Sequence, residues 1–103
     1  MSDRVQAVTD FLIRFPPDFD DYGWEVQSKG WFDGADVVWE GAVMRVTFYD
    51  PVRLAEEIDE EVAASRTPAF RNLIVVPVVT REAMEHAVRA LVGTGEIDRL
   101  SPS

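Results

Sequence analysis

The chain has 103 residues, of which 47% are hydrophobic and 11% aromatic, and it carries a formal net charge of −9. These values predict one folded domain over 1–103, with an ordered core at about 4–98 and a loose C-terminal tail. The absence of cysteine excludes disulfides, thiol nucleophiles and thiolate metal sites. The acidity disfavours nucleic acid and anionic membranes as partners. With no signal-like or membrane-spanning apolar run, we expect a cytoplasmic protein.

The N-terminal residues show helical spacing followed by strand-like segments. Apolar residues recur every three or four positions up to Phe15, and Pro16-Pro17 cannot continue a helix because proline lacks the amide donor. A first helix is therefore predicted to end there. After a loop at 18–23, residues 24–32 predict a strand, and Asp33-Gly34 is a hairpin motif leading into the next strand.

Residues 36–62 are the most clearly patterned stretch. Met44, Val46 and Phe48 alternate with the mixed set of Arg45, Thr47 and Tyr49, which predicts a strand with one apolar face. A tight turn or bulge at Glu40-Gly41 connects it to a strand at 36–39. Asp50 can cap a following helix, in which Pro51 occupies the first turn and apolar residues recur at helical spacing among five carboxylates.

The C-terminal part predicts one strand and one helix. Residues 72–79 form a nearly continuous apolar run, which is typical of a strand buried on both faces, although Pro77 places its end at an edge or beyond the paired region. Thr80 can cap the last helix, and Gly93 or Gly95 can end it. Its buried stripe is expected to contain Met84, Ala87, Val88, Leu91 and Val92.

Together these elements predict an α+β fold: a two-layer sandwich of three helices on a mixed four-stranded sheet, in the order α-β-β-β-α-β-α. Three strands form an antiparallel meander, and a right-handed crossover through the acidic helix makes the last strand parallel to its neighbour. The acidic and last helices are expected to share the face lined by Met44, Val46 and Phe48. The first helix either covers part of the second face or flanks the sheet.

Two motifs suggest metal or acid–base chemistry and are better explained as surface features. Asp18, Asp20 and Gly23 match the first, third and sixth positions of a calcium loop, but Lys29 stands where a bidentate glutamate is needed. His86 is the single histidine and falls among charged helical positions without a second nitrogen or sulfur ligand. The sequence therefore predicts no catalytic residue, no metal site and no cofactor.

The acidic helix is the first candidate for partner binding. Its carboxylates at 56–61 include Glu57 and Glu60, and Arg53 lies in register to pair with Glu56 and Glu57. A solvated helix surface explains this cluster. The alternative is a docking surface for a basic protein, for which charge raises the association rate more than the affinity.

The mixed sheet face is the second candidate. Arg45 and Tyr49 share one side of a strand, Trp39 is expected to join them from the neighbouring strand, and Trp31 from the strand before. Trp, Tyr and Arg dominate interface hot spots, and an arginine among aromatics also suits a carboxylate or phosphate. The alternative is a second packing layer beneath the first helix, with Arg45 paired to an acidic residue at its rim.

Three functions are compatible with these patterns. The first is a small acidic, non-enzymatic interaction protein that acts as partner, regulator or inhibitor of another protein, including a basic one. The second is a small-molecule binding or enzymatic domain that uses the aromatic and arginine face. The third is a structural module that self-associates into a homo-oligomer through its sheet. No phosphate loop, nucleotide fingerprint or nucleophile elbow is present to favour a named reaction.

Overall fold

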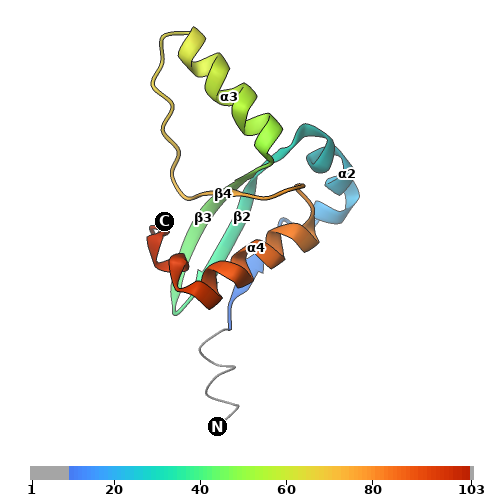
Figure 1. Cartoon of the computed structure of the whole chain (residues 1–103). Helices are drawn as coiled ribbons and strands as arrows, with labels where there is room; N and C mark the ends of the chain where they lie inside the picture. Colours follow the sequence, from blue (N-terminus) through green and yellow to red (C-terminus); the bar gives the residue numbers. More distant parts are fainter. Residues whose placement is uncertain (1–9, 103) are drawn as a thin grey trace.

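The computed structural model describes residues 10–102. Along the chain (Figure 1) the elements are β1 (Leu12–Arg14), α2 (Phe19–Lys29), β2 (Trp31–Trp39), β3 (Ala42–Tyr49), α3 (Pro51–Ala63), β4 (Leu73–Val75), α4 (Arg81–Thr94) and the 3-10 helix η1 (Glu96–Arg99). The predicted α+β class is confirmed, because the described part of the chain holds three α-helices and a mixed four-stranded sheet. Residues 2–9 of the predicted first helix lie outside the described residues.

The sheet has the order β1-β2-β3-β4, with the first three strands antiparallel and β4 parallel to β3. This confirms the predicted crossover through the acidic helix. The hairpin between β2 and β3 closes at Glu40 and Gly41, which both have positive φ (48° and 81°), as a two-residue turn requires. In this register Val37 is opposite Met44 and Ala35 is opposite Val46.

The elements predicted before β2 are partly wrong. Leu12–Arg14 is an edge strand rather than the end of a helix, with Ile13 buried and its two neighbours exposed. Residues 24–29 belong to α2 rather than to a strand, because Phe19 and Val26, two helical turns apart, both enter the core. Gly30 ends α2 in the left-handed conformation. Asp33-Gly34 is an irregularity inside the continuous strand β2 and not a hairpin.

The core lies between one face of the sheet and α4. The predicted inward positions are confirmed: Met44, Val46 and Phe48 belong to one buried cluster with Met84, Val88 and Val92 of α4. Thr80 caps α4 through its hydroxyl, and Gly95 ends it in the left-handed conformation. The expectation that the last strand is buried on both faces is wrong, because β4 is only three residues long and Val75 is 48% exposed.

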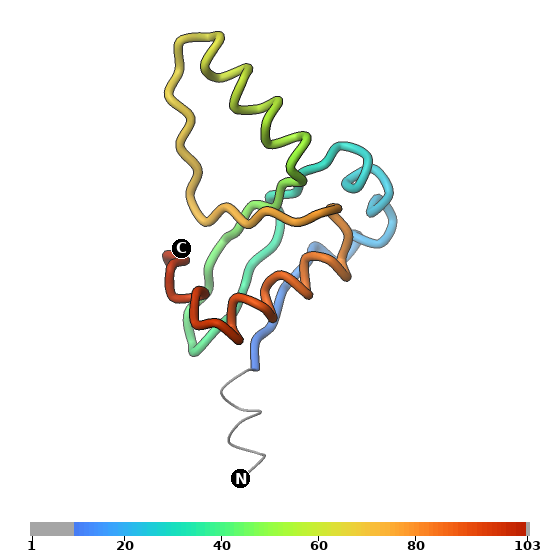
Figure 2. Tube along the Cα trace, in the orientation of Figure 1, coloured from blue at the N-terminus to red at the C-terminus, as the bar shows by residue number. Residues whose placement is uncertain are grey.

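The placement of α3 differs most from the prediction. No residue of α3 is buried, and Figures 1 and 2 show the helix projecting away from the sheet before residues 64–72 return to β4. The expectation that it shares the core face with α4 is wrong. Asp50 is the single residue between β3 and α3, so the helix leaves directly from the end of the strand, and α4 already covers the core face.

The C-terminal residues are tied back to the sheet. Ile97 of η1 is buried. The Asn72 Nδ2 donates to the Ser101 carbonyl, and the Ser101 amide donates to Asn72 Oδ1, each at 2.8 Å. The Arg71 guanidinium donates to the Pro102 carbonyl at 2.8 Å. Among the described helices, none combines the length and apolar character needed to cross a membrane.

Candidate functional site

The second face of the sheet is the first candidate surface. We call it the open face, since none of the helices in the described part of the chain covers it. Leu12, 52% exposed, and Val75 lie on the two edge strands β1 and β4, and Val43 is also exposed. Because register partners share a side of the sheet, its members follow from the strand pairing. They are Leu12, Arg14, Trp31, Asp36, Val38, Val43, Arg45, Thr47, Tyr49, Leu73 and Val75.

An ion pair crosses the middle of the open face. Arg45 and Asp36 are register partners on β3 and β2, and the Arg45 Nε donates to Asp36 Oδ1 at 2.6 Å. This hydrogen bond, and then the charge of Asp36, raise the pKa of Arg45. The pairing agrees with the expectation that an acidic residue accompanies Arg45. Because the Arg45 side chain is 57% exposed, its guanidinium adds positive charge to the surface.

An aromatic cluster lies where β3 passes into α3. The rings of Trp31 and Tyr49 stack with centroids 6.4 Å apart, and Phe70 meets Tyr49 edge-on at 5.9 Å. Lys29 places its ammonium 5.4 Å from the Trp31 ring centroid. Burial, followed by the negative charge of Glu57, raises the pKa of Tyr49. The structure therefore brings together three residues that the sequence nominated: Trp31, Tyr49 and Glu57.

Trp39 is not part of the open face. Val37 lies opposite the buried Met44, and Trp39, two residues further along β2, shares that inward side and packs against the core. The expectation that it joins Arg45 is wrong, because the two-residue turn at Glu40 and Gly41 fixes the register. A change of one residue in turn length would have placed Trp39 on the other face.

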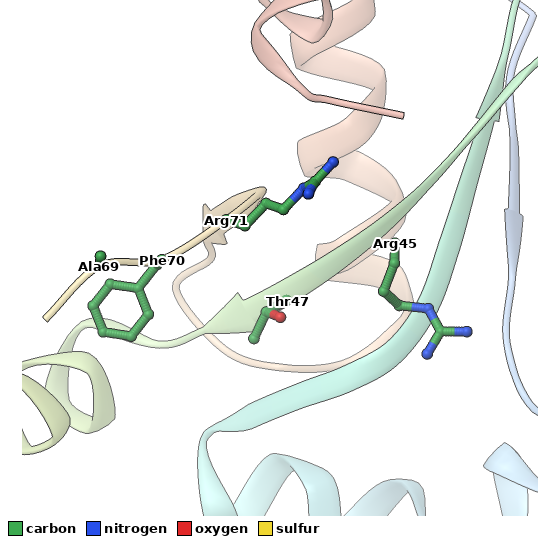
Figure 3. Close-up of a pocket in the computed structure, with 5 residues that line it drawn as sticks. All are labelled: Arg45, Thr47, Ala69, Phe70 and Arg71. Carbon is green, nitrogen blue, oxygen red and sulfur yellow. The ribbon is translucent and has the colours of Figure 1, made fainter. Parts of the chain in front are cut away.

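A hollow of about 470 Å³ opens between β3 and residues 64–72, which we call the returning segment. It is lined by Arg45, Thr47, Ala69, Phe70 and Arg71 (Figure 3). The two guanidinium groups point in different directions, so they do not converge on one point in the hollow. The sequence patterns did not predict Phe70 and Arg71 as site residues, although an aromatic residue next to an arginine in a polar connection could have indicated them.

The exposed side of α3 is the second candidate surface. Leu54, Ile58 and Val62 recur every four residues and form what we call the α3 stripe. Ile58 is 36% and Val62 59% exposed. Helical geometry places Asp59 and Glu61 on either side of this stripe. Of the three α-helices in the described residues, α2 and α4 each bury apolar residues, whereas α3 buries none.

The nominated carboxylates of α3 differ in their surroundings. Glu57 accepts from Arg53 Nη2 at 3.2 Å and lies close enough to Tyr49 to affect its pKa. Glu60 is exposed, on the side of the helix away from the stripe. Arg66, from the returning segment, bonds Glu61 at 2.6 Å and lowers the pKa of that carboxyl. The structure does not bring Glu60 near Arg45 or Trp31.

The other polar features of the described residues are dispersed. Asp20 forms an ion pair with Arg81 at 3.0 Å, and His86 is an exposed residue of α4. Within 10–102, no three His, Asp or Glu side chains are grouped closely enough to hold a metal ion. In comparisons with known proteins, no family model, no curated protein and no solved structure matches this chain.

Proposed function

We propose that the chain is a non-enzymatic interaction protein that binds another protein through the α3 stripe. One observation carries this proposal: α3 has an apolar side but buries no residue. Helices in proteins gain most of their stability from packing an amphipathic face. A projecting helix that leaves Ile58 and Val62 exposed has the arrangement of a helix that is covered by a partner.

Charge restricts the kind of partner. Between residues 51 and 63 there are five carboxylates and one arginine, which leave a formal charge of −4. A partner surface that is apolar at its centre and positively charged around it matches the α3 stripe and its surroundings. Glu57 and Glu60 contribute to this field, which mainly accelerates association and weakens as salt rises.

A binding comparison tests this proposal. Wild-type protein and an Ile58→Ser/Val62→Ser variant are immobilised separately, and proteins captured from native lysate are identified by mass spectrometry. Both residues are exposed, so the variant is expected to keep its melting temperature. A partner that is retained by the wild type, lost by this variant and weakened by Glu57→Lys/Glu60→Lys supports the proposal. Identical captures from all three proteins would contradict it.

The hollow on the open face supports a second candidate function, which is binding of a small anionic molecule. The observation in its favour is that Arg71, Thr47 and the Phe70 ring line one recess. An arginine beside an aromatic ring suits a planar carboxylate or a phosphate. A thermal-shift screen with aromatic carboxylates and phosphate esters tests it. A shift that Phe70→Ala/Arg71→Ala removes supports this candidate, and the absence of any shift counts against it.

A further inference from the structure

We infer that the α3 stripe binds the open face of a second copy of this chain, so that two copies exchange their α3 helices. This inference rests on the proposed function, because it names the occupant of the same stripe. It joins two surfaces that the described residues of one copy leave largely exposed. These are the stripe of Leu54, Ile58 and Val62, and the sheet surface bounded by Leu12 and Val75.

The crossover geometry explains why no helix within residues 10–102 covers either surface. A helix that connects two parallel strands normally packs on one face of their sheet. Here α4 covers the core face, while the crossover helix α3 projects away and no described helix lies on the open face. Placing α3 of one copy on the open face of the other would give each sheet a helix on both sides.

The joint between β3 and α3 prevents α3 from folding back on its own sheet. The Asp50 amide donates to the Gly30 carbonyl at 2.9 Å, and the Asp50 carboxylate accepts from the Arg53 amide at 2.7 Å. A Cβ atom at Gly30 would lie 2.6 Å from Asp50 Oδ2, so the end of α2 is packed directly against the start of α3. The direction of the helix is therefore fixed by contacts at its base.

Charge selects the open face over a second α3 helix. The open face contains Arg14, Arg45 and Asp36, Asp33 lies close enough for its charge to act on Arg45, and Arg71 borders the face at the hollow. This gives three arginines against two aspartates and a formal charge of +1. The charge of −4 on α3 is complementary to this surface. Pairing one α3 with another would instead bring five carboxylates against five, which is repulsive. The overall net charge of −9 makes this positive surface a local exception.

Reciprocal exchange gives a closed dimer. If each copy places α3 on the other, both contacts are equivalent by a two-fold axis and no binding surface remains unoccupied. The hollow beside Thr47 and Phe70 is the recess on the open face that can receive an apolar side chain from the incoming helix. A one-way, head-to-tail contact would leave one stripe open and give chains of increasing length.

The first experiment measures molar mass by sedimentation equilibrium over a wide range of protein concentration. We expect a monomer–dimer equilibrium whose dissociation constant rises about tenfold or more in Ile58→Ser/Val62→Ser. Val52→Ser is the matched control, because Val52 is a 70% exposed valine of α3 that lies about a third of a turn from the stripe. A monomer at all concentrations, a species that grows beyond the dimer, or a dimer equally stable in all three proteins, overturns the inference.

The second experiment uses charge reversal in two separate variants. Asp59→Lys, beside the stripe, and Arg71→Glu, at the hollow, should each weaken the dimer. In an equimolar mixture one interface pairs the two reversed charges and the other keeps the native pair, so mixed dimers should form more tightly than either variant alone. Arg99→Glu on η1 is the control and should change neither. A mixture that associates no more tightly than its components contradicts the exchange of α3.

Because the chain has no cysteine, introduced thiols can report the contact directly. Val62→Cys and Val43→Cys are mixed under mild oxidation, and we expect a mixed disulfide in excess over either homodimer. Ser28→Cys on α2 replaces Val62→Cys in the control. Equal cross-linking by the control would overturn the inference. A monomeric chain whose Ile58→Ser/Val62→Ser variant fails to capture a partner protein that the wild type retains would exclude a second copy as the occupant of the stripe. The proposed function would then stand.

Discussion

Gly30, the C-cap of α2, contacts Asp50, the N-cap of α3, at the base of α3. The Asp50 amide donates to the Gly30 carbonyl at 2.9 Å, and Gly30 has a φ of 80°. The helix α2 and the projecting helix α3 are thereby joined by a backbone hydrogen bond. The position of α3 depends on this contact more than on packing against the sheet, since α3 buries no side chain.

Gly30→Ala is expected to destabilise the protein more than Gly41→Ala. Both glycines have φ near 80°, where alanine costs about 1–2 kcal/mol, but only at Gly30 would the new Cβ meet Asp50 and Arg53 at under 3 Å. Gly41 has no atom within 4 Å of that position. Urea unfolding of both variants measures the difference, which we expect to exceed about 1 kcal/mol. Equal losses would show that the contact has no energetic role.

Removing the two helix caps should have different effects. Asp50→Ala and Thr80→Ala each delete a side chain that accepts from a backbone amide, which costs about 1 kcal/mol. Since α3 is not packed into the core, Asp50→Ala should accelerate hydrogen exchange mainly in α3. Thr80→Ala should lower the global free energy of unfolding, because α4 contributes Met84 and Val88 to the core. Exchange mass spectrometry distinguishes the two, and global protection lost in both would contradict the prediction.

The same valine-to-alanine substitution should affect stability strongly in α4 and weakly in α3. Val88→Ala removes two methyl groups from a fully buried position and is expected to cost about 2 kcal/mol. Val62→Ala, at a residue that is 59% exposed, should change monomer stability by less than about 0.5 kcal/mol. Thermal and urea unfolding at low protein concentration, where the monomer dominates, check both values. A large loss in Val62→Ala would mean that α3 is packed.

The Glu61–Arg66 pair should make a pH-dependent contribution to the stability of α3 and of residues 64–72, which follow it. The hydrogen bond and charge of Arg66 lower the pKa of Glu61 below its ordinary value of 4.5. A carboxyl with a lower pKa in the folded state stabilises it above the ordinary pKa, and this stabilisation is lost as pH falls through the folded-state pKa. NMR titration should show the Glu61 pKa returning toward 4.5 in Arg66→Ala. An unchanged pKa would mean that the pair does not persist in solution.

Local chemistry was sufficient where neighbouring residues determine the structure. The turn at Glu40 and Gly41, the alternation from Met44 to Phe48, the cap at Asp50 and the caps of α4 all follow from side-chain period, φ preference and capping within a few residues. The same applies to the parallel pairing of β4, since a helical crossover between strands imposes it. These local features are sufficient to predict the α+β class and the core face.

Tertiary packing decided the rest. Leu12–Arg14 is too short for its pattern to distinguish strand from helix end, and Trp24 and Val26 have strand-like side chains in a segment that is helical because Phe19 and Val26 both reach the core. Trp39 was assigned to the wrong side because its side depends on the register of the hairpin. The sequence by itself determined which helix is acidic and amphipathic. Only the packing of α4 over the core face, and of Gly30 against Asp50, decided that this helix projects from the sheet with its apolar stripe exposed.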